Sequence, residues 1–170
     1  TKQYLASETE TIPEMDNLIE WLADNIPDDD ETSIVHGDYR LDNMIYKNHE
    51  VIGVLDWELS TLGHPIADFS YHCLTWRTLP AMSDLKLIKE LGIPSEVEYR
   101  DMYSEYTGKD ISKNWEFYMV FNMFKIAAIC QGILGRVRDG TASSKHAEER
   151  GMQVFPISKA AWNIVETNFK

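Results

Sequence analysis

The sequence is poor in cysteine and in positive charge. Its two cysteines, Cys73 and Cys130, lie in apolar surroundings with no short-spaced partner, which favours free buried thiols and predicts a cytoplasmic protein. Only 16 basic residues stand against 28 acidic ones, for a formal net charge of -12. Such a chain repels phosphate backbones and anionic lipid surfaces, so we expect neither nucleic acid nor a membrane as a partner.

Long hydrophobic runs are also missing. The longest apolar stretch, residues 117–137, is interrupted by polar or charged side chains at Asn122, Lys125, Gln131 and Arg136. A bilayer-spanning helix needs about 20 predominantly apolar residues, so we predict no membrane span. The first ten residues are polar and acidic, and we expect no secretory leader there.

Glycine does not occur before Gly37, which excludes a glycine-rich phosphate-binding loop from the first part of the chain. Residues 1–12 have no clear periodicity and predict no regular element. Apolar residues at helical spacing then predict a helix from Pro13; they are Met15, Leu18, Ile19, Leu22 and Ile26. Pro27 and the acidic stretch 28–31 end this helix.

The remaining pattern predicts an α+β fold that is mostly helical. The 170 residues are enough for a buried core, and 44% hydrophobic residues is ordinary for a globular domain. A short β-branched run at 33–36 precedes two apolar runs that predict a small β-hairpin, at 44–46 and 51–55. An apolar segment is predicted to follow at 69–79, and then helices at 85–91, at 95–106, from a cap at Ser112 or Asn114 to Gly135 or Arg138, and at 148–169.

The most informative stretch begins at His36 and carries three oxygen-bearing side chains at a defined spacing. Asn43 follows Asp38 by five residues, and Asp56 follows Asn43 by thirteen, room for a hairpin that folds back over the first pair. An aspartate on such a loop accepts or orients the proton of an attacking hydroxyl. Asparagine and aspartate oxygens suit Mg²⁺. Arg40 is a candidate clamp on a transferring phosphoryl group.

Each of these residues also has a simpler interpretation. A single aspartate or asparagine in a loop is usually a turn or cap residue, and Arg40 would equally suit an exposed salt bridge. We expect structural roles for His36, whose ring would fix the loop by hydrogen bonds, and for Asp68, which would accept nearby donors. Glu58 is an alternative metal or supporting residue. The combination of Asp38, Asn43 and Asp56 favours function.

At these residues the sequence resembles the aminoglycoside phosphotransferase and choline kinase-like family, whose fold is related to that of protein kinases. Residues 36–43 and 54–65 are similar in particular to the kinase-like domain found fused to some acyl-CoA dehydrogenases and to its stand-alone bacterial relatives. Residues 124–127 and 131–132 fit the same subgroup.

The resemblance implies magnesium-dependent transfer of a phosphoryl group from ATP, or alternatively GTP, to a hydroxyl of a small molecule. Hydroxyacyl-CoA is the substrate implied for the fused subgroup, and aminoglycosides, choline, sugars and homoserine for the wider family. By position, Asp38 would be the base, and Asn43 and Asp56 the magnesium ligands that help to hold the nucleotide. Residues 1–170 would form the C-terminal lobe, and a longer polypeptide would supply the N-terminal nucleotide lobe. We therefore expect the chain alone to be inactive.

Two other functions stay open. One is a catalytically silent kinase-like domain that binds a ligand or partner, and the other is a metal-dependent hydrolase, for which a close His/Asp cluster is missing. Substrate recognition would come from the helical part, where polar-aromatic candidates that equally suit core packing are Trp76, Arg77, Trp115, Tyr118 and Arg136. Lys125, among apolar neighbours, suggests a buried partner or a ligand phosphate.

Overall fold

The computed structural model describes residues 1–29 and 31–169, so Asp30 of the predicted acidic stretch and Lys170 lie outside the described residues. The chain forms two compact units. We call Asp28–Tyr118 the central unit, and Thr1–Pro27 together with Met119–Lys170 the terminal unit. Helix α7, Trp115–Arg138, begins in the first and continues in the second.

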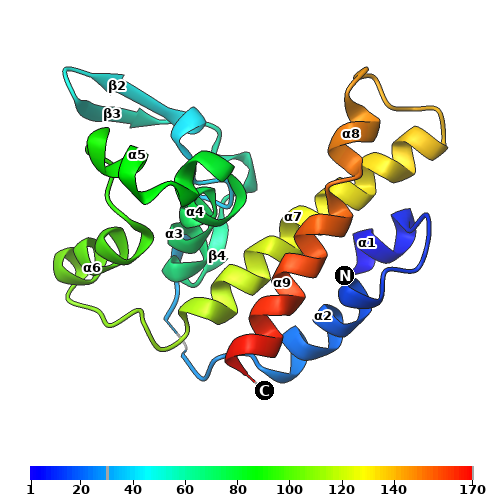
Figure 1. Ribbon diagram of the computed structural model, residues 1–170, viewed down its shortest axis with the longest axis horizontal. Coiled ribbons are helices and arrows are strands. Elements are labelled where there is room, and N and C mark those ends of the chain that lie inside the picture. The colour runs from blue at the N-terminus through cyan, green and yellow to red at the C-terminus, as the bar shows by residue number, and fades with distance from the viewer. Residues whose placement is uncertain (30, 170) are drawn as a thin grey trace. The chain divides into compact units, whose positions relative to one another are not determined.

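Two antiparallel strand pairs lie in the central unit (Figure 1). Strand β2, Met44–Lys47, pairs with β3, Glu50–Val54, as the predicted hairpin requires. Asn48 and His49 connect them with φ angles of 51° and 66°, the left-handed geometry of a tight two-residue hairpin turn.

The second strand pair joins distant segments. Strand β1, Ser33–Val35, pairs with β4, Thr61–Gly63. The sequence did not predict β4, because a strand of three residues is too short to show an alternating apolar pattern. The pairing matters for the site because it holds the segment before Asp38 against the segment after Asp56.

Short helices complete the central unit; they are η1 Leu41–Asn43, η2 Trp57–Leu59, α3 Pro65–Cys73, α4 Thr75–Thr78, η3 Pro80–Ser83, α5 Leu85–Glu90 and α6 Glu96–Thr107. Helix α3 begins four residues before the predicted apolar segment. Pro65 suits the first helical position, and the His64 ring accepts a hydrogen bond from the Ile66 N–H at 3.2 Å. Helix α6 begins with a capping box, in which Ser95 and Glu98 each accept a backbone N–H of the other.

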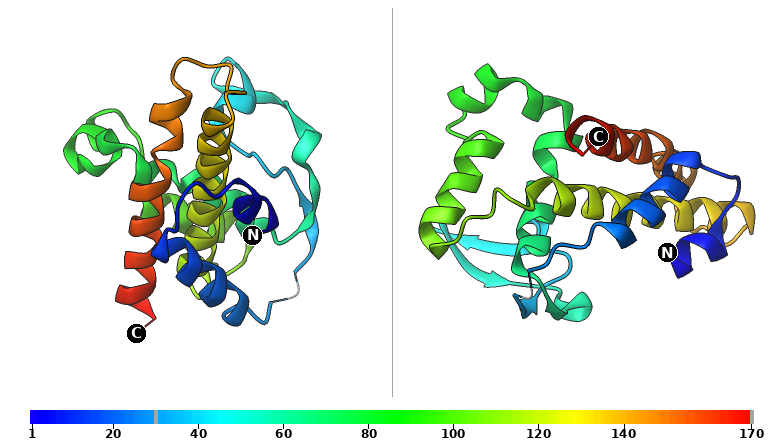
Figure 2. Two further views of the ribbon diagram at one scale, coloured as in Figure 1. Left: turned by 90° about the vertical axis from the view of Figure 1, so that its right-hand side faces the viewer. Right: turned by 90° about the horizontal axis from the view of Figure 1, so that it is seen from below.

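The terminal unit is helical. It contains α1 Lys2–Ser7, α2 Pro13–Asp24, most of α7, α8 Ala147–Gly151 and α9 Val154–Asn168. Helix α9 lies beside α2 (Figure 2), and the Trp21 and Phe169 rings meet with centroids 4.8 Å apart. The expectation of no element before residue 13 is wrong for α1. Six residues show no period, yet Tyr4 is fully buried and the Gln131 side chain donates to the Ser7 carbonyl at 2.8 Å.

The last predicted helix, 148–169, is two helices that are separated at Met152 and Gln153. Pro156 accounts for the break. Proline has no N–H and clashes with the carbonyl four residues before it, here Met152, so a helix that contains Pro156 must start anew just ahead of it.

Helix α7 corrects one expectation. By length and composition it is apolar enough to cross a membrane: an 18-residue window of α7 has a mean hydropathy of 1.5, so polarity alone does not exclude a span. However, 56% of that window is buried inside the structure, which is typical of a core helix. Its polar residues Asn122 and Gln131 are buried as well. The two cysteines are free and buried, as predicted.

Candidate functional site

A sharp turn after β1 presents the loop that carries Asp38. Gly37 adopts a φ angle of 84°, which residues with a side chain rarely tolerate. A Cβ atom at Gly37 would lie 2.5 Å from the Leu59 carbonyl oxygen, which is fixed backbone. The loop therefore needs glycine at this position for both its conformation and its close approach to η2.

The Asp38 carboxylate lies at the centre of a hydrogen-bond network. The Asn43 amide donates to Asp38 Oδ2 at 2.9 Å and to the Asp38 carbonyl at 2.9 Å. The Tyr71 hydroxyl donates to Asp38 Oδ1 at 2.8 Å. Arg40 Nε lies 3.4 Å from Asp38 Oδ2, although 52% of the Arg40 side chain is exposed. Three of the four predicted site residues, Asp38, Arg40 and Asn43, are thus brought together.

Asp56 reaches the same region through the backbone. The Leu55 N–H donates to the Asn43 carbonyl at 2.8 Å, so the residue next to Asp56 is bonded to the other predicted metal ligand. Asp56 is exposed and has a left-handed φ of 65°, a strained conformation of the kind that gathers at functional sites. Glu58, the alternative, is exposed on η2. Within the described residues, no group of three His, Cys, Asp or Glu is placed to hold a metal.

His36 links the two halves of the site, as its predicted structural role requires. Its ring Nε2 lies 2.7 Å from the Leu55 carbonyl, and its Nδ1 accepts the Asp38 N–H at 3.2 Å. These contacts are met by the neutral tautomer with the proton on Nε2. The buried ring also packs on Trp57, with centroids 4.7 Å apart. One imidazole therefore holds the peptides beside Asp56 and at Asp38 together.

Helix α3 supports the loop from the other side. The Asp68 carboxylate accepts the backbone N–H groups of His36 and Gly37, the second at 2.8 Å, which confirms its predicted structural role. Sequence reasoning missed Tyr71. The available signal was the spacing between Asp68 and Tyr71, because residues three apart in a helix share a face. Asp68 was already expected to accept nearby donors. Burial, and then the hydrogen bond to Asp38, raises the pKa of Tyr71 to about 12.

The central-unit candidates for substrate recognition are held in structural contacts. Arg77 makes a doubly hydrogen-bonded ion pair with Glu96, at 2.8 and 2.6 Å, and a second one with Glu116, at 2.6 and 2.9 Å. Burial opposes the charge of Arg77, but these two carboxylates more than offset it and raise its pKa. The Trp115 indole donates to Glu96 at 2.8 Å. These contacts favour core packing over ligand binding.

The remaining candidates are Trp76 and Tyr118 in the central unit and Arg136 and Lys125 in the terminal unit. The Trp76 indole donates to the Pro94 carbonyl at 3.0 Å, and the buried Tyr118 ring stacks on His64 with centroids 5.0 Å apart. In the terminal unit, Arg136 is exposed and Lys125 is half-buried. None of these contacts identifies a substrate group.

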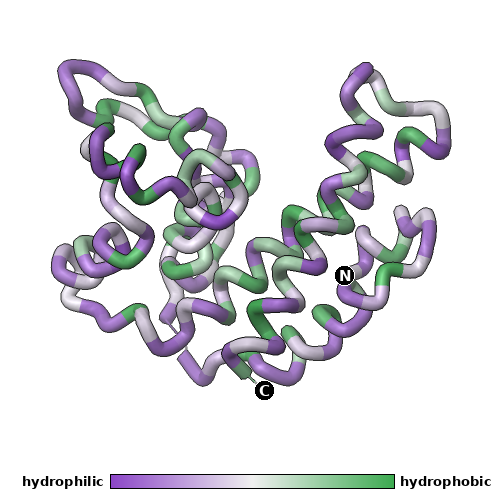
Figure 3. The backbone as a smooth tube through the Cα atoms, viewed as in Figure 1, coloured by the Kyte–Doolittle hydropathy of each residue, from purple (hydrophilic) through white to green (hydrophobic). Residues whose placement is uncertain are grey.

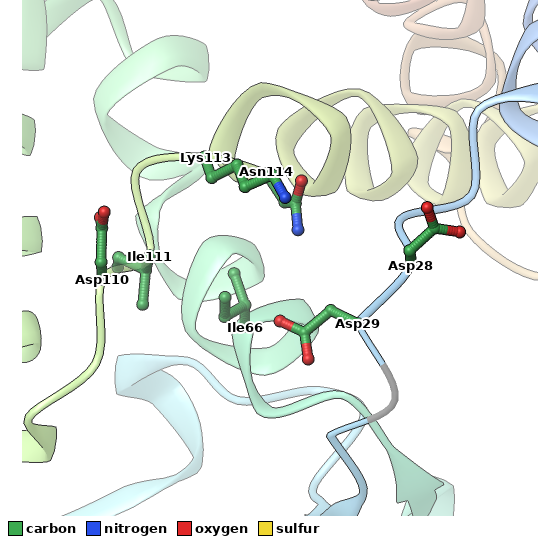
Figure 4. A pocket seen from close by; sticks show the side chains of 7 residues that line it. All are labelled: Asp28, Asp29, Ile66, Asp110, Ile111, Lys113 and Asn114. Atoms are coloured by element: carbon green, nitrogen blue, oxygen red, sulfur yellow. The ribbon is translucent and has the colours of Figure 1, made fainter.

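A separate pocket of about 280 Å³ lies at the far end of β1 from the loop (Figure 4). Its lining comes from the segment before β1, the start of α3 and the segment that leads into α7: Asp28, Asp29, Ile66, Asp110, Ile111, Lys113 and Asn114. No predicted site residue lines it. Asp29 and Asp110 accept hydrogen bonds from nearby backbone groups, so these carboxylates already serve local turns.

Comparison with known proteins shows which family the chain is similar to. A model of the phosphotransferase enzyme family matches residues 1–103. Acyl-CoA dehydrogenase family member 10 of Mus musculus is 44% identical over 171 residues and aligns with 96% of the chain. Acyl-CoA dehydrogenase family member 11 of Homo sapiens is 38% identical over 176 residues and aligns with 99% of it.

A solved structure from Ralstonia eutropha, provisionally described as an aminoglycoside phosphotransferase, is 49% identical and superposes on 98% of the chain with a TM-score of 0.91. This likeness confirms the predicted fold class, mostly helical α+β. The chain spans 53% of that structure, 16% of the mouse relative and 23% of the human one. Each of those proteins therefore contains long segments outside the matched region.

Proposed function

Because the chain belongs to the phosphotransferase enzyme family, we propose that it supplies the catalytic loop and metal ligands for phosphoryl transfer from ATP to a hydroxyl of a small molecule. The observation that carries this proposal is the Asp38–Asn43 contact at 2.9 Å, with the residue beside Asp56 bonded to Asn43. In this proposal one loop supplies the base and an amide oxygen, and the segment after the hairpin supplies a second carboxylate.

Asp38 acts as the base in this proposal. Phosphoryl transfer passes through a loose transition state, so the main requirement on Asp38 is to orient the attacking hydroxyl rather than to be strongly basic. A carboxylate whose oxygens already accept two side-chain donors is well held for this purpose. Arg40 is exposed enough to turn from Asp38 toward the transferring phosphoryl group.

Asn43 and Asp56 fit a magnesium site. The Asn43 nitrogen is engaged by Asp38, which turns the amide oxygen to the opposite side, and the Asp56 carboxylate is exposed. Two protein oxygens suit Mg²⁺, which completes its shell with phosphate oxygens and waters. When bound, the ion would neutralise charge on the phosphate oxygens during transfer. The donor set favours ATP or GTP with magnesium over a thiol- or imidazole-bound metal.

The nucleotide lobe is proposed to come from polypeptide outside this chain. The matched relatives are much longer than the chain, and apolar side chains lie exposed around the loop. Ile34 and Leu62, paired across β1 and β4, are 73% and 71% exposed. Leu55, Trp57 and Leu59 are about half exposed, at 51%, 49% and 57%. Figure 3 shows hydrophobic stretches alongside the hydrophilic tip of the hairpin. Exposed apolar groups of this kind mark interaction surfaces.

The substrate proposed first is a hydroxyacyl-CoA, with an aminoglycoside-like alcohol as the alternative. Support for the first comes from relatives that are named as acyl-CoA dehydrogenases, and support for the second from the provisional description of the Ralstonia protein. A cytoplasmic location is proposed with either one, since both buried cysteines are free thiols.

The test uses the longest natural polypeptide that contains this chain. Transfer of the γ-phosphoryl group of ATP, with magnesium, is measured against hydroxyacyl-CoA, aminoglycoside and choline panels. We expect Asp38→Asn to lower the rate at least about 100-fold, because the proton acceptor is lost. Asp42→Asn is the matched control, since that carboxylate lies on the same loop with 80% of its side chain exposed.

Equal rates for the wild type and Asp38→Asn would contradict the proposal. A protein that binds nucleotide but transfers nothing with any of the panels would support the catalytically silent domain instead.

A further inference from the structure

One face of α3 holds the loop that carries Asp38. Asp68, Tyr71 and His72 are spaced by three and four residues, so they share that face. Asp68 accepts from the loop backbone, Tyr71 donates to the Asp38 side chain, and the His72 ring lies 5.5 Å from the ring of Tyr39. Each contact acts on a different part of the loop, and only that of Tyr71 reaches the carboxylate itself.

The two oxygens of Asp38 are held by different elements. Asn43, from the loop, donates to Oδ2, and Tyr71, from α3, donates to Oδ1. A carboxylate with a donor on one oxygen still rotates about its Cβ–Cγ bond, whereas donors on both oxygens fix its plane. Tyr71 and Asn43 thus hold the two Asp38 oxygens from opposite sides of the carboxylate, one from α3 and one from the loop.

We propose that Tyr71 is a positioning residue for phosphoryl transfer, which fixes the plane of the Asp38 carboxylate in the orientation that the substrate hydroxyl requires. This inference rests on the function proposed above. In the step that it serves, the substrate oxygen forms a bond to the γ-phosphorus while the bond from that phosphorus to the bridging oxygen breaks. ADP keeps the electron pair of the broken bond, and the hydroxyl proton passes to the Asp38 carboxylate.

Tyr71 is suited to donate rather than to accept. Burial, followed by the neighbouring Asp38 carboxylate, raises the pKa of Tyr71 to about 12, so its hydroxyl keeps the proton at neutral pH. A hydroxyl that keeps its proton holds the carboxylate without taking part in the proton transfer. Tyr71 therefore acts through Asp38 and has no need to touch the substrate.

The first experiment asks whether Tyr71 and Asp38 are coupled, and it needs no activity. Urea midpoints are measured for the 170-residue chain and for Tyr71→Phe, Asp38→Ala and the double variant. Contacting residues give non-additive changes, so we expect the double variant to lose less than the sum of the single losses. Tyr103→Phe is the matched control: its ring stacks on Phe69 with centroids 3.9 Å apart, and its change should add to that of Asp38→Ala.

The second experiment measures kinetics in the longer polypeptide. We expect Tyr71→Phe to lower kcat about 10- to 100-fold with an unchanged KM for ATP, because the base is misplaced while nucleotide binding is not affected. Tyr103→Phe should keep the wild-type kcat.

Additive urea midpoints, or a Tyr71→Phe variant with wild-type kcat, would overturn the role of Tyr71. If the wild type and Asp38→Asn transfer phosphate equally slowly, the proposed function fails. The urea measurements then still decide whether Tyr71 holds Asp38.

Discussion

Gly37 shows how one backbone position determines the geometry of the loop. Its φ of 84° lets the chain turn from β1 into the loop, and the missing side chain lets η2 approach. His36 and Asp38, on either side, then point to Leu55 and to Asn43. Any residue with a Cβ would have to move η2 or abandon the turn.

We predict that Gly37→Ala lowers the free energy of unfolding by about 2–4 kcal/mol, through a strained φ and the overlap with the Leu59 carbonyl. Gly108→Ala is the control, because Gly108 has a φ of 70° but nothing within 4 Å of the added Cβ. Its cost should be about 1–2 kcal/mol, from backbone strain alone. Urea unfolding followed by circular dichroism measures both, and equal costs would show that the contact with Leu59 is unimportant.

Most of the candidate site could be predicted at the level of residues, because Asp38 and Asn43 lie on one short loop whose spacing carries the information. Tyr71 was missed, because it follows Asp38 by 33 positions and its spacing from Asp68 is informative only once α3 is known to pack against the loop. Arg77 was proposed for substrate recognition although it is paired with two glutamates, because a sequence does not show which carboxylates surround a charge. The metal-binding roles of Asn43 and Asp56 stay predictions.

At the scale of elements, Arg77 connects three helices of the central unit. It lies on α4, Glu96 opens α6 and Glu116 lies in the first turn of α7. Its side chain is 22% exposed, and those of the two glutamates are 18% and 29% exposed. Removal of one member leaves the other charges partly buried and unpaired, which costs far more than a surface ion pair contributes.

We predict that Arg77→Ala lowers the free energy of unfolding by about 3–5 kcal/mol. Lys86→Ala is the control, because Lys86 is 85% exposed and lies 3.9 Å from Glu90, and no measurable change is expected. Chemical denaturation of both variants at neutral pH gives the comparison. A loss below 1 kcal/mol for Arg77→Ala would mean that water replaces the ion pairs without cost.

The sequence predicted the long helices better than the short helices and strands. The helix from Pro13 repeats an apolar face over several turns, and the long helix that ends at Arg138 is a long, mostly apolar run, so both were clear. The six-residue α1 and the three-residue β4 depend on contacts with distant parts of the chain. Pro156 causes the break before α9. The apolar pattern continues through residues 148–169, so one unbroken helix was predicted there.

At the scale of the whole molecule, the groups that the site contains and those that it lacks predict whether the isolated chain transfers phosphate. It carries Asp38, Asn43 and Asp56, but its first 36 residues contain no glycine and so no glycine-rich phosphate loop. We predict that the 170-residue chain transfers phosphate no faster than the uncatalysed background, while the longer polypeptide is active. Parallel assays with labelled ATP and magnesium measure this. Turnover by the chain alone at the rate of the longer protein would contradict the prediction.

The division into two units has a consequence for the order in which the chain folds during synthesis. The central unit is one continuous segment, Asp28–Tyr118, and can fold as soon as it leaves the ribosome. The terminal unit joins both ends of the chain, because α2 packs on α9. Helix α2 is synthesised before the central unit, and α9 after it, so the apolar face of α2 with Met15, Leu18 and Leu22 stays open until α9 has been made. Chaperones that bind nascent chains should therefore contact α2 for longer than the helices of the central unit.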